Sequence, residues 1–348
     1  MTAAPDSLIE TPFQVDAVPG PAGSDVLSDA LRVFRVTGAA LLRGEFNAPW
    51  AWDSPPASDI AAMLHPGATR VMLMHIVAEG SCWVEVEGLP RRLLPEGSIV
   101  GFPLGGGHRM GAGDGARSVP VASLMPAPPW TRLPVLHHGE KGATTRLVCV
   151  YLRCDELPFN PILSSLPALL VVAPDEQPAS RWIEASVPYI VAEASSGRPG
   201  GACLVSRLTE LLFIEILRRH IAGLHAGDTG WLAALGDRFL ARALAAIHAR
   251  PAHPWTVPEL ARHAGLSRTA LVQRFNRILD AAPMRYLALW RLQLGAQALL
   301  STDKSIAVVA QEVGYGSEEA FSRAFKRHTD AAPATWRHAR RGQAGNVH

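Results

Sequence analysis

Residues 310–333 read AQEVGYGSEEAFSRAFKRHTDAAP, and residues 261–283 read ARHAGLSRTALVQRFNRILDAAP. The two stretches are copies of one unit, because a serine, an alanine, a phenylalanine, an arginine and an Asp-Ala-Ala-Pro tetrad recur fifty positions apart. In the second copy the turn before the serine is one residue longer. An internal repeat of this kind predicts two similar supersecondary units at the C-terminal end of the chain.

Each copy has the pattern of two short helices joined by a turn. In the first unit, 257–278, Gly265 can adopt the positive φ that ends a helix, and Ser267 can cap the next helix. The helix from 268 to 278 places Leu271, Phe275 and Ile278 on one face. The second unit, 306–328, repeats this pattern around Gly314, Ser317, Phe321 and Phe325. Both units are therefore predicted to be helix-turn-helix motifs.

A helix is expected between the two units, from about Met284 to Leu300, with Pro283 in its first turn. At 1.5 Å per residue it is roughly 25 Å long, so it can hold the units near the spacing of successive major grooves on double-stranded DNA. A plain helical bundle is the alternative, but packing alone does not require a repeated glycine turn, serine cap and Asp-Ala-Ala-Pro stop. The outward residues of the second helix of each unit are the candidate DNA-binding residues: Arg268, Thr269, Val272, Gln273 and Asn276, then Ser317, Glu318, Glu319, Arg323 and Lys326.

The charge of the chain is unevenly distributed. Residues 236–348 contain 16 Lys and Arg against 8 Asp and Glu, a formal charge of +8. Because the whole chain of 348 residues carries +2, residues 1–235 carry −6. A basic tail behind an acidic front favours phosphate contact by the tail alone.

Taken together, residues 237–340 resemble the DNA-binding domain of the AraC/XylS family of transcription regulators. The most specific stretch runs from Ala310 through Gly314, Phe321 and Arg323 to Arg337. The resemblance implies two recognition helices that enter major grooves of an asymmetric operator, with Ala320 added to the readers named above. It also implies an effect on RNA polymerase. The sequence departs from the family where a glycine usually precedes each proline, because Ala281 and Ala331 stand there, and this puts the local turn geometry in question.

The N-terminal half of the chain has a different sequence pattern. Short apolar or alternating runs divided by Gly and Pro predict antiparallel strands; they are 39–42, 71–77, 81–86, 98–102 and 146–152. The pattern Gly97-x5-Pro103-x-Gly105-x2-His108 resembles the second cupin motif. The two histidines one residue apart that a metal-dependent cupin enzyme needs are missing, since His65 stands alone and Arg70 lies near the expected carboxylate. The resemblance therefore implies a sensor barrel and no enzyme.

Several polar residues of that barrel could line a pocket for a small-molecule effector: His75, Cys82, His108, His138 and Cys149. The same imidazole and thiol groups could instead bind zinc or form a thiol redox site. A third interpretation is that they are ordinary core or rim residues. The sequence requires no cofactor, and it leaves these three possibilities open.

The expected fold class is α+β and multidomain: an N-terminal cupin-like antiparallel β-barrel, a helical linker, and a C-terminal all-α double helix-turn-helix. The expected boundaries are a tail at 1–25, the sensor at 26–157, the linker at 158–229 and the DNA-binding domain at 230–342. Prolines at the start of the linker predict a loop or short helices there. A helix from about 202 to 221 is apolar on most sides, which predicts burial in a homodimer interface or in an intramolecular core.

The remaining composition limits the cellular setting. No apolar run approaches the ~18 residues of a membrane helix, and the acidic start is unlike a signal peptide. Four cysteines without a CxxC pair suggest reduced thiols in a cytoplasm. We expect a cytoplasmic, effector-responsive transcription regulator without membrane contact. The competing classes are a cupin enzyme fused to a DNA anchor, and an architectural DNA-binding protein without a sensor.

Overall fold

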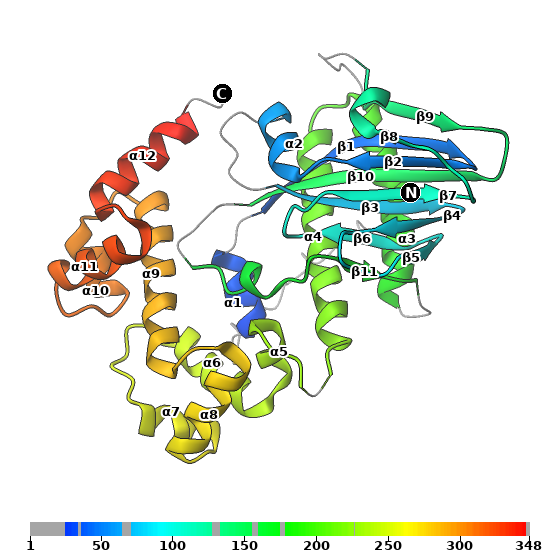
Figure 1. The fold of residues 1–348 in the computed structure, drawn as a ribbon. Helices are drawn as coiled ribbons and strands as arrows, with labels where there is room; N and C mark the ends of the chain where they lie inside the picture. Colours follow the sequence, from blue (N-terminus) through cyan, green and yellow to red (C-terminus); the bar gives the residue numbers. More distant parts are fainter. Residues whose placement is uncertain are drawn as a thin grey trace, which may run out of the picture.

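The computed structural model describes residues 25–33, 36–64, 71–126, 133–154, 159–174, 178–225 and 227–345. Two β-sheets face each other in the front part of the chain, and helices cover the outer face of one of them. The C-terminal part is entirely helical and lies beside this sandwich (Figure 1). This arrangement confirms the expected α+β, multidomain fold.

The larger sheet has the order β11-β6-β3-β10-β1-β9 and the smaller one β5-β4-β7-β2-β8. The larger sheet contains β1 Val36–Asn47, β3 Val71–Glu79, β6 Ile99–Phe102, β9 Val135–Gly139, β10 Thr144–Cys154 and β11 Leu170–Val172. The smaller sheet contains β2 Trp50–Ser54, β4 Ser81–Glu85, β5 Arg92–Pro95, β7 His108–Ala112 and β8 Ser118–Pro120. The expected runs correspond to β1, β3, β4, β6 and β10, whereas β2, β5, β7, β8, β9 and β11 were not expected.

Strand β3 shows how the sandwich is packed. Residues 71–77 are all buried, because the two faces of the strand are covered by different layers. Odd-numbered side chains point between the two sheets, and even-numbered ones point outward toward the helical layer. A continuous apolar run in a strand with both faces buried is therefore explained by the helices that cover the sheet.

Helices α3 Pro178–Ser196 and α4 Gly201–Ala222 form that layer. The expected loop with short helical turns occurs at 159–174, whereas α3, which follows it and continues for 19 residues through Pro188, was not expected. Its apolar side chains at Ile183, Val187 and Ile190 face the sheet, and this burial outweighs the one backbone hydrogen bond that Pro188 removes. Helix α4 confirms the expected helix at 202–221.

Short helices complete the front part. They are α1 Val26–Val33, α2 Ala57–Leu64 and the 3-10 turns η1 Val121–Leu124 and η2 Leu163–Ser165. Helix α1 packs against the C-terminal domain, on α6 and α9. In the described ranges, none of the helices combines the length and apolarity needed to cross a membrane.

The C-terminal domain contains α5 Trp231–Gly236, α6 Arg238–Ala249, α7 Val257–Ala264, α8 Arg268–Leu279, α9 Pro283–Ser301, α10 Ile306–Glu312, α11 Glu318–Thr329 and α12 Pro333–Gly345. The sequence signals act as expected: Gly265 has φ 74°, and the Ser267 hydroxyl accepts a hydrogen bond from the Ala270 N–H at 3.2 Å. Ser317 caps α11 through Ala320 with the same distance. Both helix-turn-helix units are confirmed, joined by α9.

The ends of α8 and α11 settle the turn geometry that the two alanines left in question. Asp280 and Asp330 have φ 49° and 57°, and their N–H groups bond to the carbonyls of Asn276 and Lys326. These two residues are the non-glycine residues with positive φ in the described chain. The left-handed position is therefore the aspartate of each tetrad. The alanine that follows it carries no such requirement.

The apolar core is divided unequally between the domains. One cluster extends from the outer face of the larger sheet through α4 to α5–α9, and it includes Phe275 of the first helix-turn-helix unit. The second unit has its own cluster around Phe321, Phe325 and Trp336. The sensor and the first unit therefore share one core, while the second unit is packed separately at the far end of α9 (Figure 1).

Candidate functional sites

The two recognition helices present similar faces to solvent. On α8, Arg268, Thr269, Gln273 and Asn276 are exposed and Val272 is half-buried. On α11, all the candidate readers are exposed: Ser317, Glu318, Glu319, Arg323 and Lys326. Both helices bury an aromatic anchor on the opposite side. Ala320 is half-buried, and its N–H is occupied by the Ser317 cap.

The first turn of α11 is acidic. The Ser317 hydroxyl hydrogen-bonds to the Glu319 carboxylate and lowers its pKa below the usual range, so this side chain is charged at neutral pH. A carboxylate repels backbone phosphates but can accept a hydrogen bond from the cytosine amino group in the major groove. The face of α11 can therefore combine acidic base readers with the basic Arg323 and Lys326.

Several basic residues of the tail have structural partners and are not free for DNA. Arg274 forms an ion pair with Asp237, and Arg341 forms one with Asp303. The Arg291 guanidinium donates to the carbonyls of Pro251 and His253 at 2.7 and 2.8 Å, which ties α9 to the loop before α7. The 16 Lys and Arg counted from the sequence therefore include side chains that are not available to phosphates.

Three of the five candidate sensor residues meet between the two sheets. His75 Nδ1 lies 2.7 Å from Cys149 Sγ, and His75 Nε2 lies 2.8 Å from His108 Nε2. His75 and Cys149 are neighbours because β3 and β10 pair in that register, and His108 comes from the opposite sheet. All three are at most 5 % exposed. Burial lowers the pKa of His75 to about 3, so the pair of histidines is neutral at pH 7.

The other two candidates have different positions. Cys82 is buried in the same interior, where burial raises the pKa of its thiol to about 12. His138 lies on β9 at the edge of the larger sheet and is half-buried, opposite Phe46 in the strand register. The structure thus separates His138 from the other four.

The space beside the histidines is small. A cavity of ≈ 30 Å³ is lined by Trp52, Ser54, His75 and Cys149 together with apolar side chains. This is room for about one or two water-sized groups, so an organic effector does not fit there in this conformation. Within the described ranges no group of three or more His, Cys, Asp or Glu is arranged to hold a metal ion. At this site His75 contacts Cys149 through Nδ1 and His108 through Nε2, so the three side chains do not direct their donor atoms to one common point.

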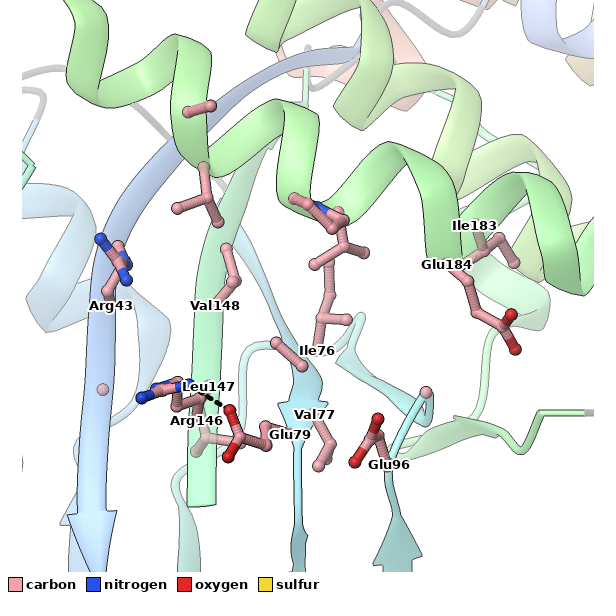
Figure 2. A pocket seen from close by; sticks show the side chains of 17 residues that line it. Arg43, Ile76, Val77, Glu79, Glu96, Arg146, Leu147, Val148, Ile183 and Glu184 are labelled. Carbon is pink, nitrogen blue, oxygen red and sulfur yellow. Dashed lines mark hydrogen bonds and ion pairs between the residues drawn. The ribbon is translucent and has the colours of Figure 1, made fainter. Parts of the chain in front are cut away.

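A much larger pocket of ≈ 740 Å³ lies outside the barrel, between the larger sheet and α3. Its floor includes Ile76 and Val148, and α3 contributes Ile183 and Val187 to its wall (Figure 2). Charged groups stand at its edges: the Arg146–Glu79 ion pair, Arg43, Glu96 and Glu184. Sequence reasoning missed this pocket. The spacing of Ile183, Val187 and Val191 was the available signal, but the surrounding prolines indicated a loop.

A buried polar network joins the linker to the DNA-binding domain. The Tyr286 hydroxyl on α9 lies 2.7 Å from Trp231 Nε1 and 2.7 Å from His248 Nε2. The backbone N–H of Trp231 donates to the Ser165 hydroxyl at 2.6 Å. These residues are far apart in the sequence, so no local pattern could have indicated the network.

The comparisons with known proteins agree with this geometry. A cupin family model matches residues 25–222 and a helix-turn-helix domain model matches residues 260–339. The chain is 30 % identical over 275 residues to the HTH-type transcriptional regulator AlkR of Acinetobacter baylyi, covering 78 % of this chain and 90 % of that protein. It is 26 % identical over 272 residues to the RCS-specific HTH-type transcriptional activator RclR of Escherichia coli, covering 78 % and 86 %.

Among solved structures, an AraC-type transcriptional regulator from Chromobacterium violaceum is 28 % identical. The match covers 31 % of this chain and 96 % of that one, with a TM-score of 0.30. The chain is thus a DNA-binding transcription regulator with a cupin domain in front of a double helix-turn-helix. It belongs to the AraC/XylS family.

Proposed function

We propose that the protein reads an asymmetric DNA operator through α8 and α11, which enter two successive major grooves, and that it regulates transcription by RNA polymerase without enzymatic activity of its own. The observation that carries this proposal is the matched exposure of the candidate readers on two helices fixed to one rod, α9. The rod is about 28 Å long at 1.5 Å per residue. That length is comparable to one turn of DNA.

Arg323 provides the sharpest test. Its exposed guanidinium can donate two hydrogen bonds to a guanine. Arg323→Ala in the full chain is expected to cost about 1 to 3 kcal/mol on the operator and much less on random DNA. Fluorescence anisotropy on both DNAs measures the difference. Arg341→Ala is the matched control, since its side chain is committed to Asp303 and is expected to leave specificity unchanged. Equal losses on both DNAs for Arg323→Ala would place this residue on the phosphate backbone.

We infer that an amphipathic small-molecule effector binds in the pocket under α3. The volume lies within the range of ligand sites, and apolar walls with a few charged groups at the edge are their usual lining. Because α3 packs on α4, and α4 shares a core with α5–α9, a displaced α3 has a physical route to the first recognition helix. A ligand shifts DNA affinity only through unequal affinity for the two states, on the order of 1 to 3 kcal/mol.

Two tryptophan substitutions on α3 test the effector pocket. Ala192 lines the pocket, whereas Ala185 is exposed on the same helix away from it. Ala192→Trp is expected to abolish the difference in reporter output with and without the native inducing condition, while operator binding persists. Ala185→Trp is expected to respond like the wild type. A full response from Ala192→Trp would exclude this pocket.

We also propose that the protein forms a homodimer in the cytoplasm. Leu211 on α4 is 49 % exposed, and Trp182 and Tyr189, two helical turns apart on α3, are also exposed. Large apolar side chains on adjacent helices of the linker support a subunit contact there. Leu211→Glu is expected to convert a dimer to a monomer in sedimentation at micromolar concentration. An unchanged mass would exclude this face.

A further inference from the structure

The side chains of Cys149, His75 and His108 are connected by two contacts, and the positions of their protons decide which atom donates in each. When the Cys149 thiol donates to Nδ1 of His75, the proton of His75 lies on Nε2. That Nε2–H then donates to Nε2 of His108. His108 Nε2 is then the acceptor, so the proton of His108 lies on Nδ1, a buried nitrogen without a hydrogen-bond partner in the described part of the chain. The three side chains therefore form a hydrogen-bonded row in which His75 Nδ1 is the ring nitrogen next to the sulfur.

The residues around the Cys149 sulfur limit the size and charge of the molecules that can reach it. The adjoining cavity of ≈ 30 Å³ accepts a molecule of about two heavy atoms. Trp52 lines it, and the Trp52 indole N–H is buried without an acceptor in the described part of the chain. An unpaired buried donor is costly, and a small polar molecule in the cavity would satisfy it. Charged or bulky reagents are excluded by the apolar lining, which includes Leu73 and Leu136.

We propose that Cys149 is an oxidation site for small, uncharged peroxides, assisted by His75 as proton acceptor. The sulfur attacks one peroxide oxygen, the S–O bond forms and the O–O bond breaks. The thiol proton passes to His75 Nδ1 and from there to the departing hydroxide. The balance is one thiol and one hydrogen peroxide giving one sulfenic acid and one water. The sulfur is oxidised by two electrons and the peroxide is reduced.

This site is a second input beside the effector pocket, and its output on DNA rests on the proposed function. Burial raises the pKa of Cys149 far above its usual range, so the resting thiol is protonated and can attack a peroxide only as its proton leaves in the same step, which His75 Nδ1 is placed to accept. The bound base removes this obstacle only during the reaction. A polar sulfenic acid between β3 and β10 disturbs the interior of the sandwich, whose outer face shares its core with the first helix-turn-helix unit.

The full-length reduced protein is treated with hydrogen peroxide, and the oxidation of each cysteine is followed by peptide mass spectrometry with a sulfenic-acid trap. Exposed Cys203 is the internal reference. We expect Cys149 to react at least about 10-fold faster than Cys203, and His75→Gln to remove that advantage. tert-Butyl hydroperoxide, which has the same chemistry and a larger body, is expected to spare Cys149. A product in which Cys149 is joined to Cys82 also counts as oxidation at Cys149.

The proposal is overturned if Cys149 reacts no faster than Cys203 in the folded protein, or if the two peroxides oxidise it equally. Thermal unfolding of His75→Gln and His108→Gln verifies that the variants are folded. Should both histidine variants unfold, Trp52→Phe tests the cavity independently, because it removes the indole donor and is expected to slow Cys149 without affecting Cys203. Operator binding by the untreated protein, measured in the same samples, tests DNA reading separately from oxidation.

Discussion

Asp280 and Asp330 show how one backbone angle fixes the exit of each recognition helix. Both are in the left-handed region, which an L-residue occupies at a cost of about 1 to 2 kcal/mol. Aspartate tolerates it better than most residues. The alanines after them, at 281 and 331, are free of this strain. The requirement therefore lies one position before the residue at which the sequence comparison placed it.

Replacing either Asp330 or Ala331 with glycine tests which of these two positions needs the left-handed backbone conformation. Asp330→Gly is expected to stabilise the protein by about 0.5 kcal/mol, since relief of strain exceeds the added entropy of the unfolded chain. Ala331→Gly adds the same entropy without relief and is expected to destabilise by about 0.5 to 1 kcal/mol. Urea unfolding measures both. Equal effects of the two changes would contradict the assignment.

Buried histidines make the stability of the fold depend on acid pH. Burial lowers the pKa of His75 and of His248 to about 3, whereas an unfolded histidine titrates near 6.5. Between these values the unfolded state binds protons that the folded state does not. Stability is therefore fully present above pH 6.5 and is lost as pH falls toward 3, by at most about 1.4 kcal/mol per pH unit for each residue.

Urea midpoints at pH 7.5 and 5.5 test this dependence. The wild type is expected to be less stable at pH 5.5. His248→Phe removes one titrating group, so its loss between the two pH values is expected to be smaller, although it is less stable at both because Tyr286 loses a partner. A midpoint that is constant or rises on acidification would show that these histidines do not control the dependence.

At the scale of elements, the contact between α9 and α11 depends on one missing side chain. A Cβ at Gly295 would lie 2.7 Å from the Phe321 ring. The glycine therefore lets the aromatic anchor of the second recognition helix lie directly against the rod. Helix propensity alone favours alanine over glycine at such a position by about 1 kcal/mol, so packing and propensity predict opposite signs.

Replacing Gly295 or Gly342 with alanine tests whether packing or helix propensity has the larger effect on stability. Gly295→Ala is expected to destabilise by about 1 to 3 kcal/mol through overpacking against Phe321. Gly342→Ala, in α12 with open space around it, is expected to be neutral or to stabilise by up to about 1 kcal/mol. Thermal unfolding of both variants is the measurement. A stabilised Gly295→Ala would mean that the ring can move away at little cost.

At the scale of the whole molecule, the division of the core predicts unequal stability. The first helix-turn-helix unit shares its core with α4 and the larger sheet, and the network at Tyr286 lies inside that shared core. The second unit relies on a smaller cluster of its own at the end of α9. Elements with fewer buried contacts open at lower free energy.

Amide hydrogen exchange followed by mass spectrometry tests this division. Helices α10 and α11 are expected to exchange faster than α6 and α9 under native conditions. Tyr286→Phe leaves Trp231 and His248 without their shared partner, and it is expected to accelerate exchange in α5 and α6 while leaving α11 close to the wild type. Uniform protection across both units would show that the C-terminal domain opens as one body.

Local patterns of amino acids were enough to predict the structure of the C-terminal domain and the class of the protein. Glycine turns, serine caps and aromatic anchors act within one or two helical turns, so Gly265, Ser267 and Phe275 could be assigned without a fold. Strands with a continuous apolar run, such as β3 and β10, were also predictable. Strands of three residues, such as β8 and β11, carry too little pattern to be recognised alone.

Which distant side chains meet depends on how the strands and helices pack in the folded chain. The register of β3 on β10 placed His75 against Cys149, the second sheet added His108, and His138 was separated from them. Burial of Ile183 and Val187 made a helix of a proline-rich segment and created the pocket beneath it. Strand register, sheet packing and the burial of a helix face depend on contacts between residues far apart in the chain. No local pattern contains that information, because its energy exists only once both partners are in place.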